Sequence, residues 1–254
     1  YPNPEAEEAF ELGLKLAKEV DADLVLATDP DADRLGVHVK DKDGVYHTLT
    51  GNMSGCLLEE YELSQRKAAN GSLPEDGAVV STIVTTNMAG TIARSYGLRF
   101  IEVLTGFKYI GQQILGFEQS GKGTYLFGFE ESYGCLIGTH ARDKDAIVAT
   151  MALCEAAAYY KTQGKTLWDA MIDMYEKYGY YKDDIQAITL KGIEGLQKIQ
   201  EIMTTLRDNT PAQIGEYKVL KARDYKKDTV TDLATGEVTP TGLPNSNVLY
   251  YELP

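Results

Sequence analysis

Residues 78–130 read AVVSTIV (78–84), TTNMAGTIARSYG (85–97), LRFIEVL (98–104), TGFKYIGQQILGFEQSGKG (105–123) and TYLFGFE (124–130). Apolar runs of strand length at 78–84, 99–103 and 124–129 are separated by helical spacing of apolar residues at 88–96 and 108–119. Strands that alternate with helices in this way are typical of a doubly wound α/β sheet. Such sheets bind ligands beyond the carboxyl ends of their strands, so the residues after 103 and 129 are candidates for a site.

The flanking segments continue the alternation and add an antiparallel part. Before this stretch we expect a helix at 5–20, a strand at 23–28, a hairpin of strands at 35–39 and 45–49, and a helix at 54–69. The apolar run at 23–28 favours a strand in a sheet that is covered on both faces. After the stretch we expect helices at 147–160 and 167–178, a strand at 184–190, a helix at 195–206 and short strands over 217–251.

The charge balance limits the kinds of partner. The 254 residues include 25 basic and 38 acidic side chains, which gives a net charge of -13. This excess of negative charge argues against nucleic acid or an anionic membrane as a partner. No segment reaches the roughly 18 consecutive apolar residues of a membrane-spanning helix, and we find no signal peptide.

Cysteine and histidine usage indicates neither a disulfide framework nor a zinc site. Cys56, Cys135 and Cys154 are an odd number at scattered spacings, without a Cys-x-x-Cys pair, and the chain has 3 His. Free cysteines are typical of a reducing compartment, so we expect a cytoplasmic protein.

Three aspartates stand at alternate positions on the turn between the strands expected at 23–28 and 35–39. Asp29, Asp31 and Asp33 would repel one another unless a cation neutralised them, and a hard divalent cation such as Mg²⁺ suits carboxylate oxygens. Arg34 follows directly and would balance the remaining charge. The pattern therefore predicts a magnesium site at this turn.

Other interpretations of this turn fit less well. A solvated acidic turn is the simplest of them. An EF-hand calcium loop requires Gly at its sixth position and Glu at its twelfth, where this chain has Arg34 and Lys40. A phosphatase with an aspartyl nucleophile also has an Asp-x-Asp motif after a buried strand, but its pattern expects Thr or Val in place of Asp33.

Four motifs in order along the chain resemble those of the α-D-phosphohexomutases, in the phosphoglucomutase and phosphomannomutase branch. The turn Asp-Pro-Asp-Ala-Asp-Arg (29–34) is similar to the magnesium loop of that family, and Gly-Phe-Glu-Glu-Ser-Tyr-Gly (128–134) to its sugar-binding loop. Thr-Gly-Phe-Lys (105–108) resembles the family's Thr-Gly-Trp-Lys segment, and Arg-Asp-Lys-Asp (142–145) its Arg-(Asp/Glu)-Lys-Asp segment.

The resemblance implies an activity and a role for each site residue. Members of the family move a phosphoryl group between O1 and O6 of glucose or mannose phosphate, through a bisphosphate intermediate. The implied magnesium ligands are Asp29, Asp31 and Asp33, the implied sugar ligands are Thr105, Gly106, Glu130 and Ser132, and the implied catalytic residues are Arg34 and Lys144. Arg34 would hold the phosphoryl oxygens or the metal carboxylates, and Lys144 would act as general acid or base or contact the phosphate.

The resemblance also implies a division into domains. Residues 1–50 correspond to the second half of the family's domain two, 51–178 to domain three, and 179–254 to the first part of domain four. We therefore expect mixed doubly wound sheets with helices on both faces, followed by an incomplete α+β domain. The family's phosphoserine loop and its phosphate-binding loop of the last domain have no counterpart here, so we expect an internal fragment, inactive alone, whose partners are the hexose phosphate and the remaining domains.

Several alternatives stay open at this point. Residues 142–145 could be a charged helix start, since exposed charge is the commoner fate of such residues. For Lys144 we favour a role in the chemistry, because a desolvated lysine near other cations can be shifted toward neutrality. Glu131 fits a structural role better than a sugar-binding one, and Lys108 fits either. The whole chain could instead be a magnesium-dependent phosphatase with Asp29 as nucleophile, or a non-catalytic module that binds sugar phosphate.

Overall fold

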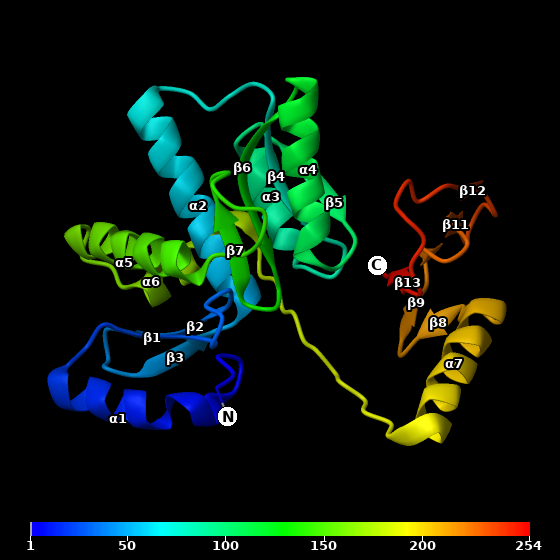
Figure 1. Cartoon of the computed structure of the whole chain (residues 1–254), viewed down its shortest axis with the longest axis horizontal. Helices are drawn as coiled ribbons and strands as arrows, with labels where there is room; N and C mark the ends of the chain where they lie inside the picture. Colours follow the sequence, from blue (N-terminus) through cyan, green and yellow to red (C-terminus); the bar gives the residue numbers. More distant parts are fainter. Residues whose placement is uncertain (1) are drawn as a thin grey trace. The chain divides into compact units, whose positions relative to one another are not determined.

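The computed structural model describes residues 2–254, so the first residue of the segment expected at 1–50 lies outside it. Its chain divides into two compact units, the first ending at Asp183 and the second comprising Asp184–Pro254. The elements of each unit are labelled in Figure 1. We describe the two units separately.

The main sheet of the first unit is built mainly from residues 78–130. It has four strands in the order β5-β4-β6-β7, which are β4 (Gly77–Thr82), β5 (Arg99–Val103), β6 (Thr124–Glu130) and β7 (Gly134–Ile137). Strand β4 runs parallel to β5 and β6, as the βαβαβ pattern predicts, and β7 is antiparallel to β6. We did not predict β7, which places Gly134 opposite Glu130.

Helices cover both faces of this sheet, as expected. Successive residues of a strand point to opposite faces, and Val79 and Val80 belong to different apolar clusters. Val79 packs with residues of α2 (Gly51–Asn70) and α3 (Asn87–Ser95), and Val80 packs with residues of α4 (Phe107–Ser120). The helices predicted at 54–69, 88–96 and 108–119 are thereby confirmed. Because β4 runs parallel to β5 and β6, the carboxyl ends of these strands lie at one edge of the sheet.

The amino-terminal part of the first unit is a small antiparallel sheet. A short 3-10 helix (Glu7–Phe10) and α1 (Glu11–Val20) precede β1 (Leu24–Thr28), β2 (Leu35–Lys40) and β3 (Tyr46–Leu49), and the strand order is β1-β2-β3. The expected hairpin is confirmed. The expectation that the strand at 23–28 is covered on both faces is wrong, because β1 is an edge strand within residues 2–254 and its side chains are half-buried to exposed.

Two further helices complete the core of the first unit, and both begin at a side-chain cap. Asp145 accepts hydrogen bonds from the backbone N–H groups of the first turn of α5 (Ala146–Thr162). Thr166 forms a capping box with Asp169 at the start of α6 (Leu167–Tyr178). Both helices were predicted, and their buried faces pack against α2 in the larger apolar cluster.

The second unit begins with α7 (Gly192–Asp208) and continues as short strands. They are β8 (Gln213–Ile214), β9 (Tyr217–Lys218), β10 (Lys221–Asp224), β11 (Thr229–Asp232), β12 (Val238–Thr239) and β13 (Leu249–Glu252). Four of them form a sheet in the order β12-β11-β10-β13. The helix and the short strands agree with the prediction, but the strand predicted at 184–190 is wrong. In the described chain this segment pairs with no strand, and Ile185 and Ile188 are exposed.

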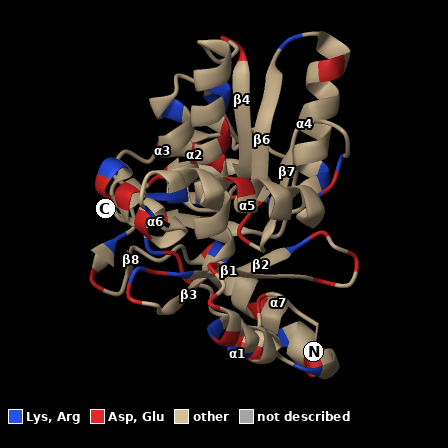
Figure 2. Ribbon diagram, turned by 90° about the vertical axis from the view of Figure 1, so that its left-hand side faces the viewer, with Lys and Arg blue, Asp and Glu red and all other residues tan. Residues whose placement is uncertain are grey.

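Acidic and basic residues are interspersed along the helices and loops (Figure 2). Across residues 2–254, none of the helices combines the length and the apolar character that crossing a membrane requires.

Candidate functional site

The turn between β1 and β2 is held in shape by the first of its aspartates. Asp29 is buried, and its Oδ1 accepts hydrogen bonds from the backbone N–H groups of Asp33 and Arg34, both at 3.1 Å. Its Oδ2 accepts a hydrogen bond from Nε of Arg34 at 2.7 Å. The left-handed backbone at Ala32 (φ +55°) lets the turn close, and the carbonyl of Ala32 accepts the N–H of Ala146 at 3.0 Å. The turn is therefore fixed to the start of α5.

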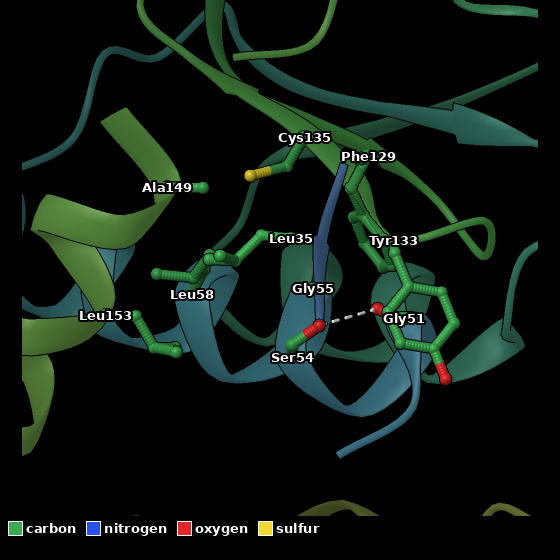
Figure 3. A pocket seen from close by; sticks show the side chains of 11 residues that line it. Leu35, Gly51, Ser54, Gly55, Leu58, Phe129, Tyr133, Cys135, Ala149 and Leu153 are labelled. Carbon is green, nitrogen blue, oxygen red and sulfur yellow. Dashed lines mark hydrogen bonds between the residues drawn. The ribbon is translucent and has the colours of Figure 1, made fainter. Parts of the chain in front are cut away.

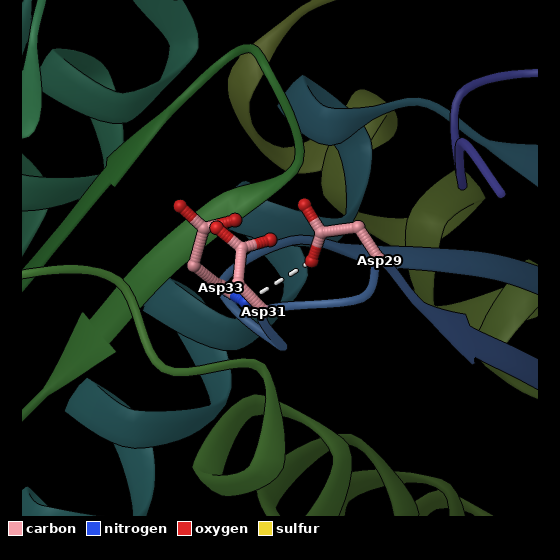
Figure 4. Close-up of side chains that lie close together, drawn as sticks. All are labelled: Asp29, Asp31 and Asp33. Carbon is pink, nitrogen blue, oxygen red and sulfur yellow. Dashed lines mark hydrogen bonds between the residues drawn. The ribbon is translucent and has the colours of Figure 1, made fainter.

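The three aspartates converge on one point, as Figure 4 shows. Each offers a carboxylate oxygen, and these oxygens all lie within 4.8 Å of one another. Asp29 is buried, Asp33 is half-buried and Asp31 is exposed. Carboxylate oxygens that meet at the protein surface suit Mg²⁺, which usually takes one or two carboxylates and keeps several waters. The donor set fits this ion.

The two inner carboxyl groups differ in how easily they ionise. Burial opposes ionisation of Asp29, but the backbone and side chain of Arg34 and the hydrogen bonds from Asp33 outweigh it and lower the pKa of Asp29 to about 2. Burial and the neighbouring Asp29 carboxylate raise the pKa of Asp33 above its ordinary value, although Lys144 opposes them. Asp29 is thus a permanent anion, while Asp33 gains most from a cation beside it.

The carboxyl ends of β5 and β6 bring two loops of the sequence motifs together. Glu130, the last residue of β6, is buried, and its Oε1 accepts the backbone N–H of Gly106 at 2.8 Å. Gly106 precedes α4 with φ +117°, a conformation that favours glycine. Burial raises the pKa of Glu130, and the hydrogen bond from Gly106 opposes this. Thr105 is exposed beside Gly106, and Ser132 is half-buried in the loop after Glu130.

Lys144 links the turn of Asp29, Asp31 and Asp33, which we call the aspartate turn, to the loops at Gly106 and after Glu130. Its Nζ lies 3.1 Å from Oδ2 of Asp33, 3.8 Å from Oε2 of Glu130 and 3.6 Å from Oδ1 of Asp143. The ammonium group also lies 5.8 Å from the centroid of the Phe107 ring. Our expectation that Lys144 is shifted toward neutrality is wrong. Burial favours the neutral amine, but Asp33 and Glu130 outweigh it and raise the pKa of Lys144, so the side chain stays a proton donor.

The other members of the segment 142–145 have structural roles. Both terminal oxygens of Glu118 accept hydrogen bonds from Nη2 of Arg142 at 2.6 Å, which ties α4 to the loop before α5. Asp145 caps α5, and its Oδ2 lies 2.9 Å from Nε2 of His140. The helix-start interpretation therefore describes Asp145, while Lys144 extends toward Asp33 and Glu130.

Two contributors to this region were not predicted. Glu5 pairs with Arg34 through Oε1 and Nη1 at 2.9 Å, so Arg34 is bound by carboxylates on two sides. Gly134 lies under Lys144, because a Cβ placed on Gly134 would stand 1.9 Å from Cδ of the lysine. The motif at 128–134 contains this glycine, so the sequence carried a signal for it, whereas nothing in the sequence marked Glu5.

Comparison with known proteins identifies the family of this chain. Residues 1–44 match the family model for phosphoglucomutase/phosphomannomutase, alpha/beta/alpha domain II, and residues 50–178 match the model for alpha/beta/alpha domain III. A curated phosphoglucomutase of Staphylococcus epidermidis is 37% identical over 247 residues, which are 97% of this chain and 44% of that protein. The chain therefore spans less than half the length of this relative.

Two solved structures share the fold. The parafusin (phosphoglucomutase) of Paramecium, in its open form, aligns with a TM-score of 0.59 at 18% identity, over 99% of this chain and 41% of its own. A putative phosphomannomutase from Thermus thermophilus aligns with a TM-score of 0.55 at 23% identity, over 75% of this chain and 40% of its own. The model for domain III alone matches half of the sequence, and the model for domain II matches the segment that carries the three aspartates. Together with the loop of Glu130, Glu131 and Ser132, which we call the Glu-Glu-Ser loop, these matches show that this chain belongs to the phosphoglucomutase/phosphomannomutase family.

Proposed function

We propose that this chain supplies the metal-binding and sugar-binding parts of a phosphohexomutase active site. The reaction is the transfer of a phosphoryl group between O1 and O6 of glucose or mannose phosphate, through a bisphosphate intermediate. One observation carries the proposal, which is that Lys144 spans Asp33 of the aspartate turn and Glu130 of the Glu-Glu-Ser loop. A hexose phosphate between these loops would have its phosphoryl group at the metal and its ring hydroxyls at Glu130.

Asp29, Asp31 and Asp33 would hold Mg²⁺. The bound ion would supply charge that stabilises the phosphoryl group during transfer. Arg34 already binds Asp29 and Glu5, so we assign it to orienting the metal carboxylates rather than to gripping the phosphoryl oxygens. Its planar guanidinium suits this task because it binds two carboxylates at once.

The remaining residues act on the sugar. Glu130 accepts hydrogen bonds from ring hydroxyls, and Ser132 donates hydrogen bonds to them or accepts from them. Thr105 brings a hydroxyl group close to the ring, and Gly106 brings the backbone close to it. Lys144 acts as a general acid or contacts the phosphate as a cation, because the raised pKa keeps its proton in place.

Transfer needs a residue that carries the phosphoryl group and a group that binds the second phosphate, and we propose that other domains provide both. Residues 1–50, 51–178 and 179–254 would then belong to three successive domains, and the whole enzyme would work in the cytoplasm. No observation favours the alternative of a phosphatase with Asp29 as nucleophile, whereas the match to two domains of the mutase family supports the proposal.

The proposal is tested by titrating glucose 6-phosphate into the ¹⁵N-labelled chain in the presence of Mg²⁺. We expect the backbone amides of Gly106 and of residues 130–134 to shift, with no conversion to glucose 1-phosphate by the chain alone. Lys144→Ala should weaken binding about 10- to 100-fold, the range expected for a lost hydrogen bond to a charged group. Lys122→Ala, on an exposed loop, is the matched control. Chemical-shift changes confined to residues outside the loops at Gly106 and 130–134 would contradict the proposal, as would turnover by the chain alone.

Gly134→Ala should reproduce the effect of Lys144→Ala without removing a functional group. The added Cβ would stand 1.9 Å from Cδ and 2.7 Å from Cγ of Lys144, so the lysine has to leave its position beside Asp33. We expect weaker binding of glucose 6-phosphate, by about 10-fold or more, in the same titration. Gly116→Ala is the control, since a Cβ there has no neighbour within 4 Å. Equal affinity of the two variants would show that the lysine does not depend on this glycine.

A further inference from the structure

Glu131 stands between the two proposed sugar ligands, yet its carboxylate contacts a different part of the structure. Its Oε2 accepts hydrogen bonds from Oγ1 of Thr85 at 3.1 Å and from Oγ1 of Thr82 at 3.4 Å. The two threonine hydroxyls are also 2.8 Å apart, and both residues are buried where β4 ends. The carboxylate of Glu131 therefore ties the loop after β6 to the loop after β4.

This contact follows from the position of the residue in the chain. Glu130 is the last residue of β6 and points toward Gly106 and Lys144. The chain turns directly after Glu130, because residues 131–133 form the turn between β6 and β7. The side chain of Glu131 meets Thr82 and Thr85 at this turn, whereas Glu130 meets Gly106 and Lys144.

The underside of the same loop rests on the first turn of α2. A Cβ on Gly51 would stand 2.0 Å from the carbonyl oxygen of Glu131 and 2.6 Å from the backbone nitrogen of Tyr133. Figure 3 shows Tyr133 beside Gly51 and Ser54 at this turn. The cavity that these residues help to line measures about 10 Å³, which is close to the space of one water molecule. The loop therefore lies directly on the helix.

The helix and the loop after β4 are joined to each other as well. Oδ1 of the buried Asn52 accepts the backbone N–H of Thr86 at 3.2 Å. Oγ of Ser81, in β4, donates to the carbonyl of Phe129 in β6 at 2.8 Å. The loop at 130–134 thus contacts α2 through its backbone, and it contacts the end of β4 through the side chain of Glu131. Helix α2 and strand β4 are themselves fixed by the hydrogen bonds of Asn52 and Ser81.

We propose that Glu131 is a positioning residue that holds Glu130 and Ser132 in the orientation in which they meet the sugar. This rests on the proposed function for the two ligands. The Glu131 carboxylate accepts hydrogen bonds from two threonine hydroxyls. A Gln side chain has the same length and also ends in an acceptor oxygen, so it can take over this role. Glu131→Gln should keep the contact with Thr85, and Glu131→Ala should lose it.

A spectroscopic reporter allows the test to be made without ligand. The amide proton of Gly106 donates to Glu130, so its chemical shift reports where Glu130 lies. In the ¹⁵N-labelled chain, Glu131→Ala and Thr85→Val should move the Gly106 resonance, while Glu131→Gln should leave it in place. Glu176→Ala, at an exposed position of α6, is the control for loss of a surface carboxylate. If Thr85→Val leaves the Gly106 resonance unchanged, the proposal is overturned, even where Glu131→Ala fails to fold.

A binding experiment distinguishes a failure of this proposal from a failure of the proposed function on which it rests. Titration with glucose 6-phosphate should give an affinity about 10-fold lower for Glu131→Ala and within about twofold for Glu131→Gln, as expected for one hydrogen-bonded contact. If Glu130→Ala abolishes binding while Glu131→Ala has the affinity and Gly106 shift of the wild type, the positioning role is wrong and the site assignment stands. If the unaltered chain shows no shifts in either loop, the proposed function fails, and the ligand-free Gly106 resonance still decides the role of Glu131.

Discussion

We expect Mg²⁺ affinity to fall at least about 100-fold when Asp31 and Asp33 are both changed to Asn, because the change removes two of the three carboxylates that meet at the turn. Asp29 remains as a single carboxylate, and its oxygens are shared with hydrogen bonds from Arg34 and from the backbone of Asp33. Loss of a residue that only supports a ligand typically costs about 10- to 100-fold in metal affinity, and loss of two ligands should cost more. Isothermal titration calorimetry with MgCl₂ measures the effect.

The control for this prediction removes the same charge elsewhere. Asp43 and Asp183 are exposed and lie outside the turn, so the double change Asp43→Asn, Asp183→Asn should leave Mg²⁺ affinity within about twofold of the wild type, as screened surface charges contribute little. Comparable losses of Mg²⁺ affinity in the two double variants would mean that the ion is held by the overall negative charge of the chain. Unaltered affinity in the Asp31→Asn, Asp33→Asn variant would show that Mg²⁺ does not bind at the turn.

The second large effect concerns stability and a carboxyl group outside the site. Glu59 on α2 is fully buried, and within the described residues neither of its carboxyl oxygens has a hydrogen-bond partner. The adjacent Glu60 differs, because it binds Lys177, Tyr178 and Tyr96. Burial raises the pKa of Glu59 well above its ordinary value, and the neighbouring Glu60 carboxylate adds to this effect. The folded state therefore keeps Glu59 protonated.

The direction of the pH effect follows from this shift. Below the unfolded pKa, near 4.5, both states hold the proton, so the ionisation of Glu59 does not change the free energy of unfolding. Above that value the unfolded state ionises while the folded state does not, so the free energy of unfolding falls by about 1.4 kcal/mol for each pH unit until the folded pKa is reached. Glu59→Gln removes this loss. We expect the variant to melt at a higher temperature than the wild type at pH 8, by about 2–4 °C for each kcal/mol, and the difference to shrink toward pH 4.5.

Calorimetry at several pH values checks this prediction, with Glu19→Gln on the exposed face of α1 as the control. A surface change of this kind should alter stability by less than about 0.5 kcal/mol. A gap in melting temperature between wild type and Glu59→Gln that does not vary with pH would show that ionisation of Glu59 has no part in it.

The sequence predicted the parts of the fold that depend on local pattern. Apolar periodicity located every helix from α1 to α7 and the three parallel strands, because burial of one face leaves a repeat in the sequence. Strand β7 was missed because Gly134–Ile137 has four residues and no alternation of its own. The segment 184–190 has the composition of a strand, but a strand also needs a pairing partner, which local composition does not reveal.

Motifs identified the candidate site but not the contacts inside it. The spacing of Asp29, Asp31 and Asp33 was enough to predict that they converge, because a tight turn keeps alternate residues close. The protonation of Lys144 was mispredicted, since the outcome depends on Asp33 and Glu130, which are far from it in sequence. Arg142 and Lys144 are two residues apart, yet Arg142 binds Glu118 and Lys144 extends toward Asp33 in the aspartate turn. Such differences arise from tertiary packing.

We propose that the aspartate turn and the loops at Gly106 and 130–134 form one site, and paramagnetic relaxation by Mn²⁺ tests this directly. Mn²⁺ occupies sites built for Mg²⁺, since both prefer carboxylate oxygens and water. In the ¹⁵N-labelled chain, substoichiometric Mn²⁺ should broaden the amide resonances of Gly106 and Ser132 together with those of the turn, and the Asp31→Asn, Asp33→Asn variant should abolish the effect. Sharp Gly106 and Ser132 resonances while acidic residues elsewhere broaden would contradict the account.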